Sequence, residues 1–263
     1  MSQPEHALLT GANGVFGLHI AAGLAARGYH THCVVRSAAK GEALLSQLAS
    51  KGAPAALLQV HVCDLTDAAS IAALPSQLPS LSILVNNAAF TSPTRQEAQS
   101  GVELQWATNV LAYQRLMRAC LPLLQASSGR AVFVASSYAG GLNVSDPEFK
   151  APGSYCGDSA YRASKQANRM LGRAWAGRYP AVGVYTCHPG VATSAVSLGL
   201  GFDLDRSEAA AAGGARTPLF LALSPKEGLE SGGYYSDCAV KACKFSQDAG
   251  ECQRLWELVE SYD

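Results

Sequence analysis

The sequence predicts an α/β fold: a single domain in which a doubly wound parallel sheet lies between two layers of helices, a Rossmann-like three-layer αβα sandwich. Three observations support this. Apolar segments of strand length alternate with helical segments along the 263 residues. A glycine-rich turn follows the first apolar segment and precedes a helix. With 48% hydrophobic and only 15% charged residues, the chain can also bury one large core.

The alternation can be followed along the chain. Strands are expected at short apolar runs, namely 7–9, 32–35, 57–62, 81–85, 131–135 and 182–187. Helices are expected between them: one ending at Arg27 and Gly28, one from about Lys40, one ending near Leu124, and one over 161–177. Two stretches without a clear period, about 140–158 and 198–216, are predicted to be substrate-side loops at the carboxyl edge of the sheet, where such folds bind ligands.

Composition narrows the class of partner. The 20 basic and 20 acidic residues cancel without forming a basic block, so neither a nucleic acid nor an anionic membrane surface is expected to bind. The eight cysteines include no Cys-x-x-Cys pair and the six histidines no metal-spaced pair, which favours reduced thiols and no bound metal. No leader-like segment or membrane span is recognisable. We therefore expect a cytoplasmic protein that acts on a small molecule.

The glycine-rich turn reads TGANGVFG from Thr10. Gly11 would permit a tight turn, Gly14 would let the backbone approach a pyrophosphate, and Gly17 would let the helix pack close to the strand. Backbone N–H groups at the start of the helix would then face the anion. The predicted dinucleotide loop also contains Asn13, Val15 and Phe16. The alternative is a structural turn without a ligand.

The end of the second expected strand bears on the choice of cofactor. An acidic residue there would bind the ribose hydroxyls of NAD, whereas a basic residue would accept the 2′-phosphate of NADP. The strand runs into Arg36, with Lys40 nearby and no acid between them. This favours NADP(H). The alternative is that Arg36 is only a solvated charge at a strand end.

Further motifs follow in a fixed order. They are the Asn86-Asn87-Ala88-Ala89 run, Asn109 in a helix, the Ser136-Ser137 pair, Tyr161 with Lys165 four residues later, and His188-Pro189-Gly190. With these motifs, nearly the whole chain resembles the short-chain dehydrogenases/reductases. Within that superfamily it is most similar to the branch of the retinol dehydrogenases and the WW-domain oxidoreductase, through VVRSAAKGEALL from Val34, HPGVATS from His188 and GYYSDC from Gly233.

The resemblance implies an oxidoreductase that moves a hydride between a nicotinamide and a carbonyl or alcohol. Tyr161 would be the acid/base, provided that a neighbouring positive charge lowers its pKa from about 10. Lys165, one helical turn away, would supply that charge and hold the nicotinamide ribose. Ser137, the second serine of the pair, would bind the substrate oxygen, Ser136 would be structural, and Asn109 would fix a proton-relaying water. Tyr155 is not followed by a lysine four residues later.

The resemblance also implies cofactor contacts after the ends of the third, fourth and sixth strands: Asp64 and Leu65 at the adenine, Asn87 and Ala88 at its ribose and backbone, Gly190 and Val191 at the carboxamide, and Ser194 near the pyrophosphate. His188 is expected to be a packing residue. Many relatives are dimers or tetramers, so a homodimer or homotetramer is expected.

Two positions depart from the branch. Its middle loop glycine falls where this chain has Val15, and Gly14 instead matches the spacing of extended enzymes that act on nucleotide sugars. Ala89 also replaces a glycine. The leading hypothesis is a carbonyl reductase or alcohol dehydrogenase for a lipophilic substrate, because apolar residues occur in the two predicted loops: Leu142, Phe149, Leu198, Leu200 and Phe202. The alternatives are an NADP(H)-binding sensor or scaffold and a sugar-nucleotide epimerase.

Overall fold

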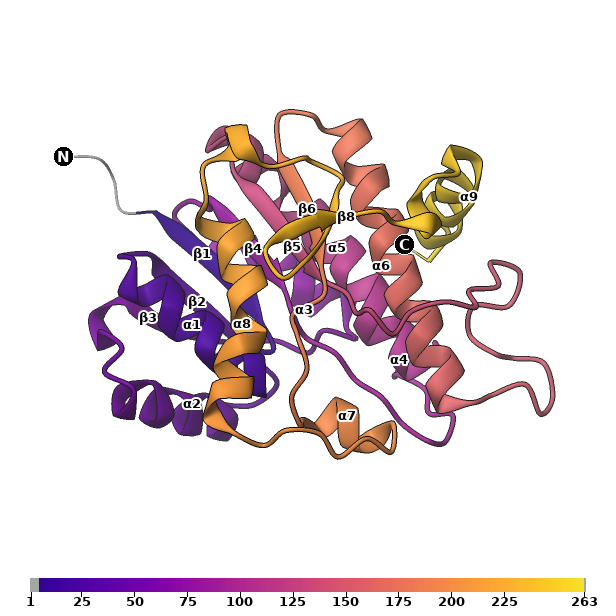
Figure 1. Ribbon diagram of the computed structural model, residues 1–263, viewed down its shortest axis with the longest axis horizontal. Helices are drawn as coiled ribbons and strands as arrows, with labels where there is room; N and C mark the ends of the chain where they lie inside the picture. The colour runs from indigo at the N-terminus through magenta and orange to yellow at the C-terminus, as the bar shows by residue number, and fades with distance from the viewer. Residues whose placement is uncertain (1–4, 263) are drawn as a thin grey trace.

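An eight-stranded sheet runs through the centre of the computed structural model, which describes residues 5–262 (Figure 1). Its strand order is β3-β2-β1-β4-β5-β6-β7-β8, and every neighbouring pair is parallel except β7 with β8. The strands are β1 His6–Thr10, β2 His30–Val35, β3 Leu58–Val62, β4 Ile83–Asn86, β5 Arg130–Val134, β6 Gly183–Cys187, β7 Tyr234–Ser236 and β8 Ala239–Lys241. The predicted fold class, one α/β domain of Rossmann type, is confirmed.

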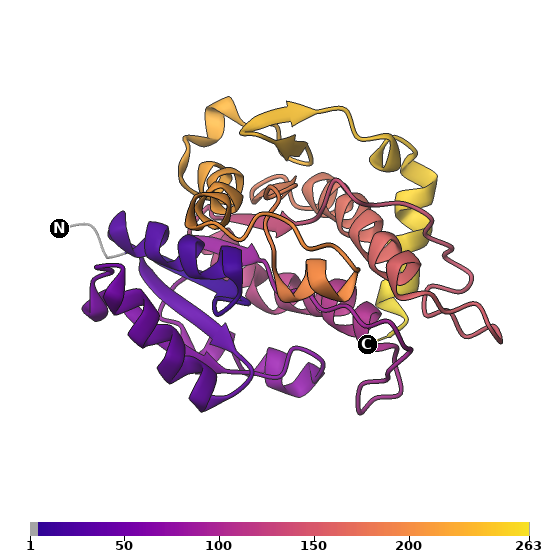
Figure 2. The same ribbon diagram turned by 60° about the horizontal axis from the view of Figure 1, so that its bottom comes forward.

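Helices cover both faces of the sheet (Figures 1 and 2). One face carries α1 Val15–Ala26, α2 Ala38–Ser50 and α8 Glu208–Leu223. The other carries α3 Ala68–Ala72, α4 Leu104–Trp106, α5 Ala112–Ala126 and α6 Gly157–Arg178, with α9 Ala249–Glu260 packed on the outside of α6. The short helix α7, Ala195–Gly199, lies apart from both layers, beyond the edge of the sheet at which β6 ends. No helix within residues 5–262 is long and apolar enough to cross a membrane.

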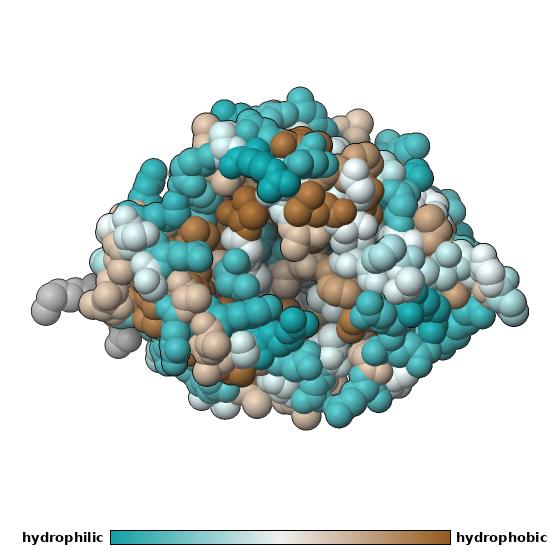
Figure 3. All heavy atoms as spheres, turned by 90° about the horizontal axis from the view of Figure 1, so that it is seen from below, coloured by the Kyte–Doolittle hydropathy of each residue, from teal (hydrophilic) through white to brown (hydrophobic). Residues whose placement is uncertain are grey.

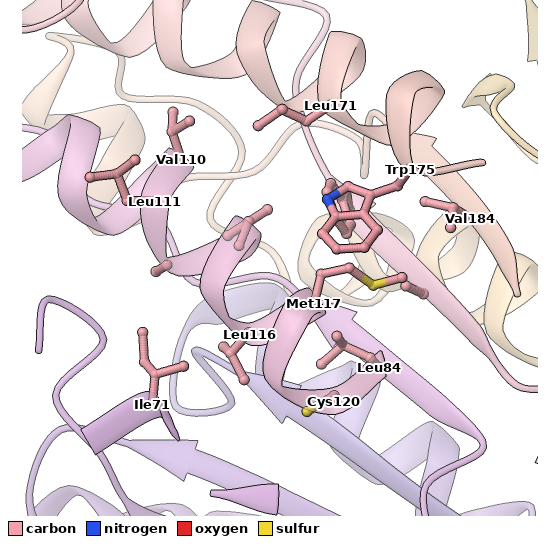
Figure 4. Close-up of a cluster of buried hydrophobic side chains, with 14 of the residues drawn as sticks. Ile71, Leu84, Val110, Leu111, Leu116, Met117, Cys120, Leu171, Trp175 and Val184 are labelled. Atoms are coloured by element: carbon pink, nitrogen blue, oxygen red, sulfur yellow. The ribbon is translucent and has the colours of Figure 1, made fainter. Parts of the chain in front are cut away.

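The two cores follow from the alternation of side chains along each strand. In β1, Leu8 belongs to the core under α5 and α6, whereas Leu9 belongs to the core under α1 and α8. Figure 4 shows the first of these cores, in which Met117 of α5 and Trp175 of α6 face each other above the sheet. The Trp175 indole N–H donates to the Gln114 side-chain oxygen at 2.8 Å, which satisfies its only donor inside the core.

The two predicted loops are shorter than expected. Helix α6 begins at Gly157, so only the last two positions of the first stretch are helical. The second prediction is wrong over 198–199, the end of α7, and over 208–216, the first nine residues of α8. Its small residues hid the helical period, and they are small because α8 packs closely on α1: a Cβ at Gly214 would lie 2.1 Å from the Phe16 ring. The β7–β8 hairpin was not predicted as strands.

A chain of hydrogen-bonded imidazoles crosses the first three strands. His6 Nδ1 lies 2.9 Å from His32 Nε2, and His32 Nδ1 lies 2.8 Å from His61 Nε2. His61 Nδ1 lies 2.9 Å from the side-chain oxygen of Gln77. An amide oxygen can only accept, so one direction of donation, from each Nδ1–H, satisfies the whole chain with all three rings neutral. A further proton on His32 or His61 would set two donors against each other.

We expect this histidine chain to make folding sensitive to acid. Burial and the neighbouring imidazoles lower the pKa of His32 to about 4. The unfolded histidine takes up a proton below its usual pKa of 6.5 while the folded one stays neutral, so stability is present above pH 6.5 and is lost as the pH falls towards 4. The expected loss from His32 is about 2 kcal/mol between pH 7 and pH 5. Urea denaturation at both values should show it, and His32→Leu should flatten the slope; an unchanged slope in that variant would contradict the assignment.

Candidate active site

The candidate site lies at the carboxyl edge of the sheet, where the strand order reverses between β1 and β4. Doubly wound sheets leave a crevice at such a point, because the connections on either side leave in opposite directions. Figure 3 views this face, the one on which α7 lies, and shows a hollow near its centre with hydrophobic residues on part of the rim. The expected site residues follow the strands that end at this edge of the sheet.

The glycine-rich turn has the geometry of a phosphate-binding loop. Gly11 has a φ of +63°, and a Cβ there would lie 2.8 Å from the Ala88 Cα. A Cβ at Gly17 would lie 2.0 Å from the Gly11 carbonyl oxygen, so α1 can approach β1 this closely only with glycine at that position. Gly14 is the N-cap of α1, and no side chain of the described residues caps this helix. Its first N–H groups are therefore available to an anion.

Asn87 and Thr10 fasten this loop to the end of β4. The Asn87 side-chain NH2 donates to the carbonyl oxygens of Thr10 and Gly11 at 3.0 and 3.1 Å. The Thr10 hydroxyl accepts from the backbone N–H groups of Asn87 and Ala88 at 2.9 and 3.0 Å. The Asn87 amide therefore shapes the loop, and its neighbour Ala88 lies against Gly11, where the cofactor contact was expected.

Tyr161 and Lys165 lie one turn apart on α6 and are both buried, with 7% and 1% of their surface exposed. The Lys165 Nζ donates to the Val134 carbonyl oxygen, at the end of β5, at 2.9 Å. It also lies 5.8 Å from the centre of the Tyr161 ring and 5.4 Å from that of the Tyr113 ring. The Tyr113 hydroxyl donates to the Ala88 carbonyl at 3.0 Å, so this tyrosine, which the sequence did not single out, joins the lysine to the loop after β4.

The expected effect of Lys165 on the acidity of Tyr161 is not found. Burial raises the pKa of Tyr161 to about 12, against the lowering effect of a hydrogen bond with Ser136. Burial also lowers the pKa of Lys165 to about 7. Burial dominates the pKa of each side chain, because removing both groups from water favours their neutral forms. Tyr161 is consequently a protonated donor at neutral pH, and Lys165 changes its charge near neutrality.

The structure separates the two serines that follow β5. Ser136, expected to be structural, is the buried one, and its hydroxyl is hydrogen-bonded to Tyr161. Ser137, expected to bind the substrate oxygen, is exposed. Its N–H donates to His188 Nδ1 at 3.1 Å, and its hydroxyl lies 3.4 Å from His188 Nε2. The structure therefore brings Ser136, rather than Ser137, against the phenol.

Asn109 occupies a single π-helical turn, Ala107–Leu111, between α4 and α5. Its side chain accepts from the Phe90 N–H at 2.8 Å and donates to the Phe90 carbonyl at 2.9 Å. It also donates to the Ser164 hydroxyl of α6 at 3.1 Å. The side chain is thus fully engaged in joining the loop after β4 to α6. Any relay through this residue would use its backbone, which the π turn frees from the regular helical ladder.

The remaining expected cofactor residues lie on loops at the same edge. Arg36 directly follows β2 and is exposed. Within residues 5–262, neither the Arg36 guanidinium nor the Lys40 ammonium forms an ion pair. Asp64 follows β3 and accepts from the N–H and hydroxyl of Thr66 at 2.9 and 2.8 Å; Leu65, next to it, packs partly against the core. Ser194 is the N-cap of α7.

Gly190 and Val191 form the turn after β6. Gly190 has a φ of +132°, and a Cβ there would lie 3.3 Å from the Gly214 Cα of α8. Val191 projects from this turn and is 58% exposed. The close approach of Gly190 to α8 therefore leaves the Val191 side chain on the surface of the turn, at the edge where the carboxamide contact was expected.

Large apolar side chains are exposed on the segments that follow β5 and β6 at this edge of the sheet. Five of the eight large exposed hydrophobic residues within 5–262 follow β5 or β6: Tyr138, Val191, Leu198, Phe202 and Leu204. Among the expected substrate residues, Leu198 and Phe202 belong to this group, and the Phe202 ring lies edge-on to the Tyr138 ring at 5.7 Å. By contrast, Leu142 packs partly on the core, and Phe149 contacts Tyr155, whose hydroxyl is bonded to Gln105 and Ser92.

Comparison with known proteins accounts for this arrangement. Residues 5–199 match the short chain dehydrogenase family. The chain is 32% identical over 267 residues to human retinol dehydrogenase 12, covering 95% of this chain and 84% of that protein. It is 29% identical over 274 residues to dehydrogenase/reductase SDR family member 12 of Bos taurus, covering 96% and 84%. A crystal structure from Mycobacterium paratuberculosis, 26% identical, superposes with a TM-score of 0.80 over 98% of this chain and 94% of that one. This protein therefore belongs to the short-chain dehydrogenase family of oxidoreductases.

Proposed function

We propose that this protein is an NADP(H)-dependent carbonyl reductase or alcohol dehydrogenase for a lipophilic aldehyde, ketone or alcohol. One observation carries the proposal: a buried tyrosine and a buried lysine, one helical turn apart, adjoin a serine pair at the edge of the sheet that also holds an uncapped glycine loop. The glycine contacts and the free N–H groups of α1 suit a dinucleotide pyrophosphate. A bound nicotinamide dinucleotide would supply or accept the hydride.

The protein's own side chains would transfer the proton. Tyr161, protonated at neutral pH, would donate its phenolic proton to the substrate oxygen as the carbonyl is reduced. Ser136 hydrogen-bonds the phenol and would hold it in place, while Ser137 would offer its hydroxyl to the same oxygen. Lys165 would hold the ribose hydroxyls and, when charged, stabilise the tyrosinate left behind. In alcohol oxidation these roles run in reverse.

The choice of a lipophilic substrate rests on the exposed apolar side chains that follow β5 and β6. Exposed large apolar side chains are costly to leave in water, and clustering them at a site entrance indicates that an apolar ligand covers them. Phe202 and Tyr138 provide an aromatic pair there, from the segments after α7 and β5 respectively. One relative, human retinol dehydrogenase 12, is named for a lipophilic alcohol. We therefore expect long-chain and polyene aldehydes to be better substrates than short ones.

The test is NADPH and NADH oxidation against a panel of aldehydes, ketones and quinones. The wild type should prefer NADPH, and Arg36→Asp should raise the KM for NADPH by roughly 30-fold, because a charge-assisted hydrogen bond to the 2′-phosphate is lost and repulsion replaces it. Arg27→Asp makes the same charge change at the far end of α1 and should leave the preference unchanged. An unaltered preference in Arg36→Asp would remove Arg36 from this role.

The same assay separates the alternative functions. Steady oxidation of NADPH by any carbonyl of the panel would exclude a protein that only senses the dinucleotide. An epimerase would instead keep its cofactor through turnover with no net oxidation. The glycine spacing that suggests an epimerase is accommodated here by an ordinary helix start at Gly14, so it gives that function no structural support beyond the spacing itself.

A further inference from the structure

Both ring nitrogens of His188 lie close to Ser137, and His188 has no role in the proposed reaction. Its ring follows β6, and the adjacent ladder is intact: the Ala135 N–H donates to the Cys187 carbonyl at 2.8 Å. The His188 N–H also donates to the Tyr235 carbonyl at 2.9 Å. Hydrogen bonds to β5 and β7 therefore fix the backbone that carries the imidazole. His188 Nδ1 lies 3.1 Å from the Ser137 backbone nitrogen, and Nε2 lies 3.4 Å from the Ser137 hydroxyl oxygen.

The contact with the backbone determines the tautomer of the neutral ring. A backbone N–H can only donate, so His188 Nδ1 must be the unprotonated acceptor and Nε2 must carry the proton. Nε2 lies 3.4 Å from the Ser137 hydroxyl oxygen, and with a proton already on it this nitrogen cannot accept a hydrogen bond from that hydroxyl. The exposed hydroxyl of Ser137 therefore keeps its own proton for a partner other than His188. Such a donor suits a carbonyl oxygen that becomes negative during reduction.

The charges around the ring favour its neutral form. Burial and the Arg169 guanidinium of α6 lower the pKa of His188, whereas Asp237, in the turn after β7, raises it. Arg169 is itself held in place, because it donates to the Ser136 carbonyl oxygen and stacks over the Tyr234 ring at 3.6 Å. If His188 were protonated, Nδ1–H would face the Ser137 N–H, and the turn carrying both serines would lose its acceptor.

We propose that neutral His188 is a positioning residue that aims the Ser137 hydroxyl at the substrate oxygen. The proposal rests on the reductase function argued above. It predicts that protonation of His188 disables Ser137 while Tyr161 remains a competent donor, since the phenol stays protonated in acid. Carbonyl reduction should therefore lose kcat on the acid side with a midpoint below 6.5, the usual pKa of histidine.

Two substitutions test the proposal through kinetics. His188→Leu removes both contacts and should lower kcat by roughly 30-fold with the Kd for NADPH unchanged, as expected for a misaligned donor. His188→Asn restores an acceptor near the position of Nδ1 but cannot titrate. It should recover most of the loss, to within roughly 3-fold of the wild type, and should abolish the acid limb. His19→Asn, a histidine on α1 beside Glu208, should keep the acid limb.

Nitrogen-15 spectra of histidine-labelled protein provide a readout that needs no turnover. They should show the Nε2–H tautomer for His188, and its titration should shift the Ser137 amide resonance. The Nδ1–H tautomer, or an acid limb that survives in His188→Asn, would overturn the proposal. If the wild type reduces no carbonyl, the reductase function fails, and the spectra alone then decide whether neutral His188 orients the Ser137 hydroxyl as described.

Discussion

Tyr161→Phe is expected to reduce carbonyl turnover by at least about 10³-fold while leaving the Kd for NADPH within about twofold of the wild type. The phenol is almost fully buried and its pKa is raised to about 12, so at neutral pH it is protonated and can serve as a proton donor. Phenylalanine keeps the ring and its packing and removes only that proton. Stopped-flow NADPH oxidation, together with fluorescence titration of NADPH, measures the two effects separately.

Tyr155→Phe is the matched control for this variant. Tyr155 lies just before the same helix, but its hydroxyl is bonded to the Gln105 side chain and the Ser92 carbonyl. Its loss should cost about 1 kcal/mol of unfolding free energy and leave kcat almost unchanged. Turnover by Tyr161→Phe close to that of the wild type would show that another group delivers the proton, and the proposed mechanism would then be wrong.

Lys165→Met is expected to inactivate the enzyme by about 10²–10³-fold and, at the same time, to stabilise the fold at neutral pH. The ammonium is 1% exposed, and burial lowers its pKa from 10.5 to about 7. The unfolded lysine keeps its proton up to its usual pKa, whereas the folded one loses it near 7. Stability therefore rises with pH between about 7 and 10.5 in the wild type.

Burial of Lys165 with a lowered pKa costs on the order of 4 kcal/mol of unfolding free energy at pH 7, and methionine removes this cost. The variant loses about 1 kcal/mol in turn, because the hydrogen bond to the Val134 carbonyl is gone. Urea denaturation at pH 7 and pH 9.5 should show a more stable variant with a flatter pH dependence. Lys241→Met, at an exposed lysine of β8, should alter neither stability nor kcat. A Lys165→Met variant that is less stable at pH 7 would show that the charge is compensated within the fold.

Lys165 also links the proposed cofactor site to pH. Lys165, with a pKa of about 7, loses its positive charge as the pH rises above neutrality. Its stabilisation of the Tyr161 phenolate should therefore decrease at alkaline pH. Carbonyl reduction should therefore have a bell-shaped pH profile, with the acid limb set by His188 and the alkaline limb by Lys165. The two groups lie at the ends of different strands: His188 follows β6, and Lys165 contacts the end of β5. The phenol itself contributes to neither limb.

Some features of this protein were determined by the sequence alone. Short apolar runs predicted six strands of the sheet, because strands and helices differ in period over a few residues. The glycines of the loop were recognisable for the same local reason, since a positive φ at Gly11 and the close packing at Gly17 tolerate no side chain. The four-residue spacing of Tyr161 and Lys165 likewise placed both side chains on one face of α6 before any contact was known.

The tertiary structure decided what depends on contacts between distant segments. The small residues of α8 concealed its helical period and are explained only by its packing on α1. The two serines could not be told apart by spacing, because their roles depend on Tyr161, which follows them by more than 20 positions, and on His188, which comes from another strand. The directions of the Tyr161 and Lys165 pKa shifts follow from burial, a property of the assembled core that no local pattern contains.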